Sequence, residues 1–323
     1  MPEPSPPAYH DIGGRPAGRI DRRERQLFFW EKQIAAIRVL LGDCELVPLE
    51  ALRNAFETFG EPLYVELGFF ERMLAATIEV LEGRGVVARS DLNARVAALE
   101  ATYGAPRTLL PSPAAQPDPY GGGYRYWAVA GPDAPPSRHQ LLCDALRDEL
   151  VERGVLEAGA IRVAIERIEA PGVHLGAKIV ASAWVDPAFR AAILDDGMTA
   201  CREFGIPFLD GRLTVLANSD EVHNVVVCTL CSCYPRNLLG QPPAWYVGKA
   251  YRARTVREPR AVLAEFGTVL PTDVEVRVHD STAELRYIVL PLRPEGTVGW
   301  DEARLAALVT RDSLIGVAPA RNP

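Results

Sequence analysis

The chain has no apolar run long enough to cross a lipid bilayer, so its sequence excludes an ordinary membrane-spanning helix. It also lacks an excess of basic residues: 35 Lys and Arg stand against 42 Asp and Glu, for a formal net charge of -7. That balance argues against nucleic acid or an anionic membrane surface as a partner. Residues 1–7 contain neither the basic stretch nor the apolar core of a secretory signal. We therefore expect a cytoplasmic protein with no nucleic-acid or membrane partner.

Cysteine is scarce except in one hexapeptide. The chain has six cysteines, and Cys228, Cys231 and Cys233 all lie within residues 228–233, at the end of an apolar run. Disulfides among sulfurs so closely spaced would be strained, because a bridge needs separated Cα atoms with converging Cβ vectors. We expect the other three cysteines to be reduced residues of the core: Cys44, Cys143 and Cys201.

Three thiols on one loop allow several interpretations. Half of a tetrahedral zinc site would use Cys228 and Cys231, but no second C-x-x-C motif follows them in the sequence. A redox pair of the thioredoxin type has no use for the third thiol. A buried Cys-rich strand would have no chemical role. The spacing favours a metal ion, and the other interpretations stay open at this point.

Apolar spacing and turn residues divide the chain into two parts, and 323 residues with 48% hydrophobic content are enough for two domains. Residues 104–137 are crowded with Gly and Pro and are predicted to form a linker. Helical intervals between apolar residues occur in three segments before it: 34–41, 49–59 and 69–82. The first part is therefore predicted to be mostly helical.

The second part mixes strands and helices. Helices are predicted to begin at Asp186-Pro187 and Glu258-Pro259, where an acidic residue precedes a Pro that suits the first helical position. Buried strands are predicted over four segments: 213–217, 225–227, 274–278 and 286–290. We expect an α/β (α+β) fold in which the cysteine loop follows the end of a strand.

The surroundings of the cysteines resemble the α subunit of nitrile hydratases. The resemblance covers roughly residues 137–317, and the related thiocyanate hydrolase has a catalytic subunit of the same kind. It is carried by HNVVVCTLCSCYP from His223, PPAWY from Pro242, YRARTVREPR from Tyr251 and DSTAELRY from Asp280. The resemblance implies a layered metal-binding catalytic domain over residues 137–323.

The first hundred residues are similar to a different subunit of the same family. YHDIGGR from Tyr9, FWE from Phe29, and the pairs at Leu52 and Glu71 resemble the helical N-terminal half of the β subunit. The chain is thus predicted to be a fusion: a β-like helical domain over 1–104, a linker over 105–136 and the α-like domain. No counterpart of the small β-barrel domain of the β subunit is recognisable in the sequence.

The resemblance implies a specific metal centre. Cys228 would supply an axial thiolate, and Cys231 and Cys233 would bind in the equatorial plane together with the deprotonated backbone nitrogens of Ser232 and Cys233. Neither amide position is Pro, which would lack the N–H, and soft thiolates suit a transition metal. In the family the equatorial cysteines are oxidised, here Cys231 to a sulfinate and Cys233 to a sulfenate. Thr229 matches cobalt versions of the motif, so Co(III), one per chain, is favoured over Fe(III).

The resemblance also implies a role for Arg53 and a set of partners. Arg53 matches a β-subunit arginine that holds the oxidised sulfurs, a role that suits the bidentate guanidinium. The absent barrel implies a separate small subunit and a hetero-oligomer. A metal-insertion activator chaperone is expected as well.

The predicted activity is that of a nitrile hydratase-like hydro-lyase, a carbon–nitrogen lyase that converts a small nitrile into its amide. Two alternatives remain: hydrolysis of thiocyanate to carbonyl sulfide and ammonia, and a metal-bearing subunit without turnover. The subunit without turnover is suggested by departures from the family pattern. Phe69 and Phe70 replace a pair of tyrosines, and Leu209 stands at the place of a Gln. His223 and His279 are expected to be structural imidazoles rather than acid–base groups.

Overall fold

The structure is a computed structural model that describes residues 9–24, 26–103, 136–208, 211–230 and 233–323. The chain forms two compact units. Unit 1 consists of the residues up to His10 together with Asp21–Ile168, and unit 2 consists of Asp11–Ile20 and Glu169–Pro323. Within the described residues no helix is long and apolar enough to span a membrane. The predicted linker over 105–136 lies almost entirely outside the described residues.

Unit 1 is helical, as predicted for the first part of the chain. Its described elements are α1 (Phe29–Asp43), α2 (Leu49–Thr58), α3 (Glu61–Glu66), α4 (Phe69–Gly83), α5 (Arg89–Tyr103), α6 (Arg138–Glu152) and α7 (Ala160–Glu169). The three predicted helical segments correspond to α1, α2 and α4. Buried residues of α6 and α7, such as Leu146 and Ile161, belong to the same apolar core as those of α1, α2, α4 and α5. The division predicted from the resemblance, with boundaries at 104 and 137, stays a prediction. The division by contacts is a different one, since it groups α6 with the helices before the linker.

Three helix-to-helix turns of unit 1 share one geometry. In each, a residue with positive φ follows the first helix: Glu45 at 59°, Gly85 at 68° and Gly154 at 66°. In each, a valine N–H then donates to the carbonyl of a leucine in the last helical turn, at 2.9 or 3.0 Å. Glycine adopts this conformation readily, which accounts for two of the turns. In the third, Glu45 occupies the left-handed position.

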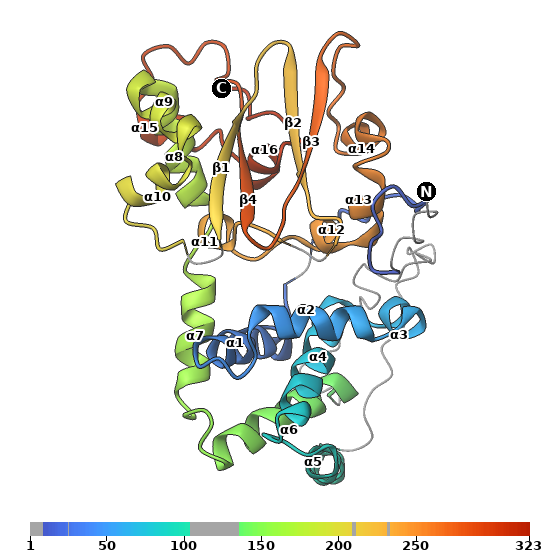
Figure 1. Cartoon of the computed structure of the whole chain (residues 1–323). Helices are drawn as coiled ribbons and strands as arrows, with labels where there is room; N and C mark the ends of the chain where they lie inside the picture. Colours follow the sequence, from blue (N-terminus) through green and yellow to red (C-terminus); the bar gives the residue numbers. More distant parts are fainter. Residues whose placement is uncertain (1–8, 25, 104–135, 209–210, 231–232) are drawn as a thin grey trace, which may run out of the picture. The chain divides into compact units, whose positions relative to one another are not determined.

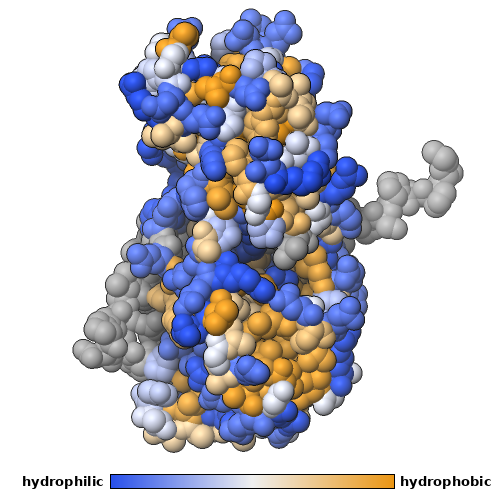
Figure 2. All heavy atoms as spheres, turned by 90° about the vertical axis from the view of Figure 1, so that its left-hand side faces the viewer, coloured by the Kyte–Doolittle hydropathy of each residue, from blue (hydrophilic) through white to orange (hydrophobic). Residues whose placement is uncertain are grey.

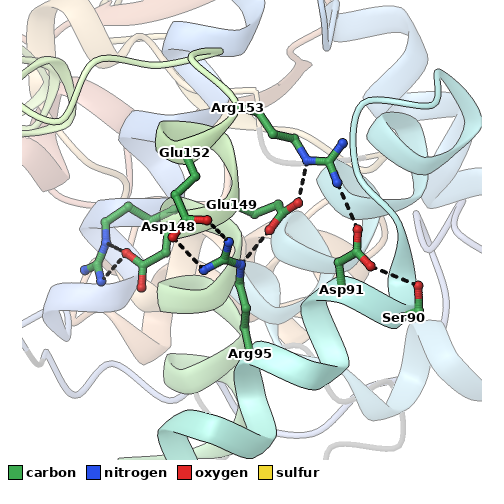
Figure 3. Close-up of polar contacts among 8 residues, drawn as sticks. Ser90, Asp91, Arg95, Asp148, Glu149, Glu152 and Arg153 are labelled. Atoms are coloured by element: carbon green, nitrogen blue, oxygen red, sulfur yellow. Dashed lines mark hydrogen bonds and ion pairs between the residues drawn. The ribbon is translucent and has the colours of Figure 1, made fainter.

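An ion-pair cluster joins α5 to α6 (Figure 3). Arg95 pairs with Glu149 at 2.5 Å and also with Glu152. Arg153 pairs with Glu149 and, at 2.9 Å, with Asp91. Glu149 is only 4% exposed and lies between the two guanidinium groups. The cluster therefore links the last helix before the linker to the first helix after it.

Unit 2 contains two parallel strand pairs surrounded by short helices (Figure 1). β1 (Arg212–Ala217) pairs with β4 (Leu285–Leu290), and β2 (Val222–Val227) pairs with β3 (Glu275–Asp280). These are the four strands predicted from the sequence. Helices α8 (Val173–Val185), α9 (Pro187–Asp195) and α10 (Met198–Glu203) lie on the β1 side in Figure 1. The remaining helices are α11 (Arg236–Leu239), α12 (Ala244–Val247), α13 (Lys249–Arg254), α14 (Pro259–Glu265), α15 (Glu302–Ala306) and α16 (Arg311–Ile315).

Both predicted helix starts in unit 2 are present. Asp186 precedes α9, and its carboxylate accepts from the N–H groups of Ala188 and Phe189. Glu258 precedes α14, but its side chain bonds Arg254 instead of capping the helix. Capping chemistry therefore explains the start of α9, whereas Pro259 alone sets the start of α14.

The surface of unit 1 is partly apolar on the side of α7 (Figure 2). Val163 of α7 is 55% exposed, and Phe29 at the start of α1 is 66% exposed. One predicted core residue is in fact at the surface: Cys44 is exposed, because it follows the last residue of α1 in an open turn. Cys143 and Cys201 are buried free thiols, as predicted, and burial raises their pKa values to about 12 and about 11.

Candidate metal centre

The cysteine loop begins where β2 ends. Cys228 follows Val227 directly and has no exposed surface, and Cys233 is 6% exposed. Leu230, between them, is 50% exposed, so the middle of the loop reaches solvent. Cys231 and Ser232 lie outside the described residues. The structure thus brings both ends of the predicted ligand set into the interior of unit 2.

Two side chains hold the loop through its carbonyl groups. Arg252 donates from Nε to the Cys228 carbonyl at 2.9 Å and from Nη2 to the Thr229 carbonyl at 2.8 Å. The Tyr246 hydroxyl donates to the Cys233 carbonyl at 2.7 Å. A rigid guanidinium fork fixes two consecutive carbonyls more firmly than a single donor would. The main chain is therefore fixed on both sides of the residues predicted to chelate.

Arg252 also places a positive charge next to the main chain of the loop. The residue is 1% exposed, and a buried cation is stable only where anionic or strongly polar groups face it. Its position beside Cys228 suits a loop whose sulfurs carry negative charge. A soft transition metal bound by thiolates meets this requirement.

Asp280 holds the loop from the neighbouring strand. It is the last residue of β3 and lies opposite Val227 in the parallel register. Its carboxylate accepts from the Thr229 N–H at 2.9 Å and from the Thr229 hydroxyl at 2.5 Å. Both strands end at the same edge of the sheet, so Asp280 reaches the first residues of the loop without a detour of the chain. Thr229 is thereby bound through both its main chain and its side chain.

An aromatic cluster of Tyr234, Trp245, Tyr246 and Tyr251 packs beside the loop. Tyr246 packs edge-on against Tyr234 at 4.9 Å between ring centroids, and Trp245 packs in the same way against Tyr251 at 4.9 Å. The Tyr251 hydroxyl donates to the Val226 carbonyl at 2.6 Å. Burial raises the pKa of Tyr246 well above its ordinary value, so this phenol is a neutral donor. The cluster excludes water and keeps the donor groups in place.

The described part of the loop fits a metal site without completing one. Among the residues that the structure describes, no group of three or more His, Cys, Asp or Glu side chains could hold a metal ion. The predicted set needs Cys231 and the two backbone nitrogens as well, and these ligands fall on or beside the two residues that the structure does not describe. What the geometry supplies is two buried cysteines whose flanking carbonyls are fixed.

The two histidines that attracted attention in the sequence have structural roles, as expected. His223 Nε2 bonds the Gly316 carbonyl at 2.7 Å, and His279 Nε2 bonds Asn224 Oδ1 at 2.8 Å. Burial lowers the pKa of both imidazoles, which keeps them uncharged at neutral pH. Both support the strand pair that carries the loop.

The remaining predicted residues are placed as follows. Arg53 lies in α2 of unit 1 and is partly buried, and its role toward oxidised sulfurs stays a prediction. Phe69 and Phe70 begin α4 and pack edge-on at 5.0 Å. Arg72 in the same helix bonds the Tyr64 and Leu67 carbonyls. Leu209 lies outside the described residues.

Sequence reasoning assigned no role to Arg252, Tyr246 or Asp280. Each stands in a stretch that resembles the family, but a single sequence shows no reason why a particular Arg or Tyr faces a loop that precedes it. The signal that could have found Asp280 is its place at the end of a predicted strand beside the strand of the cysteines.

The fold is of mixed α/β architecture, and one parallel strand pair ends at a buried cysteine loop whose carbonyl groups are held by Arg252 and Tyr246. Comparison with known proteins gives the family. The family model described as "Nitrile hydratase, alpha chain" matches residues 137–318, and the one described as "Nitrile hydratase beta subunit, N-terminal" matches residues 7–118. The chain belongs to the nitrile hydratase family.

Several known proteins are similar to this chain over a little more than half of its length. The α subunit of the low-molecular-weight cobalt-containing nitrile hydratase of Rhodococcus rhodochrous is 54% identical over 181 residues, which are 55% of this chain and 87% of that protein. The γ subunit of thiocyanate hydrolase from Thiobacillus thioparus is 46% identical over 194 residues, 56% of this chain and 80% of that protein. A doubly substituted iron-type nitrile hydratase of Comamonas testosteroni has a similar structure: TM-score 0.54, 43% identity, 56% of this chain and 89% of that one.

Proposed function

We propose that this chain is the metal-bearing catalytic subunit of a nitrile hydratase-type hydro-lyase that adds water across the C≡N bond of a nitrile to form the amide. The observation that carries the proposal is the cysteine loop, whose Cys228 and Cys233 carbonyls are held by Arg252 and Tyr246. Such support holds the main chain at Cys228 and at Cys233, the two described ends of the proposed ligand set.

The ligands in this proposal are Cys228, Cys231, Ser232 and Cys233, with one low-spin Co(III) per chain. Support for cobalt comes from Thr229 after the first cysteine and from the cobalt-containing relative. The bound ion would supply a Lewis acid that polarises the substrate. Cys231 would carry the sulfinate, and the Cys233 sulfenate oxygen would act as base or nucleophile. The chain holds these groups through the contacts of Arg252, Tyr246 and Asp280.

Further parts of the proposal concern residues and partners beyond the loop. Arg53 would donate to the oxidised sulfurs through its guanidinium. A separate small subunit would supply the barrel that is not recognisable here, so the active form would be a hetero-oligomer. An activator chaperone would insert the metal. The β-type match is to the N-terminal part of the β subunit, which supports this arrangement.

Thiocyanate hydrolysis is the second candidate. It is supported by the 46% identity with the γ subunit of a thiocyanate hydrolase, whose match covers 56% of this chain. A subunit without turnover is the third, supported by Phe69 and Phe70, which carry no hydroxyl for a substrate hydrogen bond.

One set of assays separates these functions. The chain is purified after co-expression with its genomic neighbours and cobalt, and amide release from nitriles and carbonyl sulfide release from thiocyanate are measured. Cys233→Ser should abolish either activity, whereas Cys44→Ser, at an exposed position outside the loop, should not. Amide formation supports the leading proposal, and carbonyl sulfide alone favours the second. A cobalt-loaded chain with neither product would contradict both.

A further inference from the structure

A segment from the β-like part of the chain is built into the metal-bearing unit. Residues Asp11–Ile20 belong to unit 2, although the rest of that unit begins at Glu169. The Gly14 N–H donates to the Ala253 carbonyl at 2.8 Å, and Arg254 Nη1 donates to the Gly18 carbonyl at 3.0 Å. Ile12 has no exposed surface. We call Asp11–Ile20 the strap; in Figure 1 it lies close to α13.

The strap approaches the cysteine loop at Gly13. A Cβ atom added to Gly13 would lie 3.1 Å from Thr229 Cγ2 and 3.3 Å from Thr229 Cβ. Carbon atoms in ordinary contact are about 3.5–4.0 Å apart. Any side chain at Gly13 would therefore press on the residue that follows Cys228.

Thr229 cannot turn away from that pressure. Its hydroxyl is bound to the Asp280 carboxylate at 2.5 Å, which fixes the side-chain rotamer, and its carbonyl accepts from Arg252. Rotating the methyl away from Gly13 would break the bond to Asp280. The backbone at position 13 imposes no separate demand for glycine, because its φ is not in the left-handed region, unlike that of Gly14 at 76°.

We propose that Gly13 is a positioning residue of the cysteine loop: by presenting no side chain, it leaves room for the Thr229 methyl and so sets where Thr229 and the adjoining Cys228 lie. The strap thereby limits which residue can follow the first cysteine, since a methyl-bearing residue fits only opposite glycine. The consequence for metal loading rests on the proposed function, whereas the steric relation between Gly13 and Thr229 does not.

The test is a double-substitution cycle with a matched control. Gly13→Ala adds the clashing methyl, and Thr229→Ser removes the methyl that it meets while keeping the hydroxyl. Gly18→Ala is the control, because Gly18 lies in the same strap, has no positive φ and has nothing within 4 Å of an added Cβ. Each variant is made in the full chain with its partner proteins. The thermal unfolding midpoint without metal, the cobalt content and the cobalt–thiolate absorption are measured.

We expect Gly13→Ala to lower the unfolding midpoint by about 3 °C or more and to reduce cobalt content to less than about half. Gly18→Ala should match the wild type. The pair Gly13→Ala/Thr229→Ser should recover most of both losses and the wild-type absorption. If Gly13→Ala alone fails to fold, recovery of a folded, cobalt-loaded double variant supports the inference equally well.

The inference is overturned if Gly13→Ala behaves like Gly18→Ala, or if Thr229→Ser gives no recovery. It is also overturned if the midpoint follows the cycle while cobalt loading and absorption stay at wild-type levels in every variant, because Gly13 would then have only a structural effect. A wild-type chain that takes up no cobalt contradicts the proposed function instead. In that case the unfolding midpoints still decide whether Gly13 positions Thr229.

Discussion

Arg252 is bound to the first cysteine of the loop through the main chain, its Nε donating to the Cys228 carbonyl at 2.9 Å. The side chain therefore positions the main chain that carries this sulfur. This relationship makes Arg252 the most sensitive point of the site outside the ligands themselves.

Replacing Arg252 by Lys should loosen the hold on the loop at the Cys228 and Thr229 carbonyls. Lysine keeps the charge but offers a compact point donor instead of a fork, so it cannot serve the Cys228 and Thr229 carbonyls together in the same geometry. We expect a loss of about 1.5–3 kcal/mol in unfolding free energy and a clear loss of bound metal. Denaturant unfolding and metal analysis measure both. Arg260→Lys is the matched control, because Arg260 also donates to main-chain carbonyls but is exposed; equal behaviour of the two variants would refute the role of Arg252.

The hydroxyl of Thr229 should contribute more to the free energy of unfolding than the shape of its side chain. Thr229→Val keeps the size of the side chain but leaves Asp280 without its 2.5 Å partner. A hydrogen bond to a charged group contributes about 1.5–3 kcal/mol, so Val should destabilise by that order. Thr229→Ser retains the bond and should cost less. Chemical unfolding of the two variants compares them directly, and a Val variant as stable as the Ser variant would show that the Asp280 bond adds little.

The ion-pair cluster between α5 and α6 gives a pH dependence with a definite sign. Arg95, and secondarily Arg153, lower the pKa of Glu149 below its ordinary 4.5. A carboxylate with a lowered folded-state pKa stabilises the fold above its ordinary pKa, and that contribution is lost as pH falls through the folded-state value. Glu149→Gln should therefore be less stable at pH 7 and show a flatter stability profile between about pH 5 and 3.

The control for Glu149 is Glu157→Gln, at an exposed position of the same unit. It should leave the pH profile of the wild type in place. Unfolding midpoints measured across the acid range separate the variants. A Glu149→Gln profile as steep as that of the wild type would assign the acid sensitivity to other carboxylates.

The shared core of unit 1 predicts that the chain can be divided. Leu141, Leu146 and Leu150 of α6 are fully buried in a core shared with α1, α2, α4 and α5. Two co-expressed fragments, 1–118 and 119–323, should therefore copurify without a covalent link. Leu146→Asp should weaken the association, because it would bury a charge without a partner, while the contacts of Asp11–Ile20 with the second fragment remain. Fragments that separate in the absence of any substitution would contradict a shared core.

How much could be predicted differs between the two units and the site. Helices α1, α2 and α4 follow from their apolar spacing, and the four strands follow from short runs of branched apolar residues. The turn at Glu45 did not, because local propensity disfavours a non-glycine residue with positive φ. Cys44 was assigned to the core from its residue type alone, and it is exposed.

In the site, the spacing of the cysteines predicts a metal loop, and that stays a prediction; the residues that hold the loop could not be predicted from the sequence. Arg252 and Asp280 act across 24 and 51 positions of the chain, and only the fold brings them to the loop. Gly13 is more distant still in sequence. A glycine that is needed because of a contact, and not because of its φ, cannot be recognised from local sequence patterns.

The proposed function depends above all on residues 228–233 forming an oxidised, cobalt-bearing loop. Intact mass and metal analysis of the peptide that contains these residues tests this directly, with protein co-expressed with its genomic neighbours and supplied with cobalt. We expect stoichiometric cobalt and three added oxygen atoms, two on Cys231 and one on Cys233. Zinc bound to unmodified thiols would contradict the proposal and leave a structural metal site.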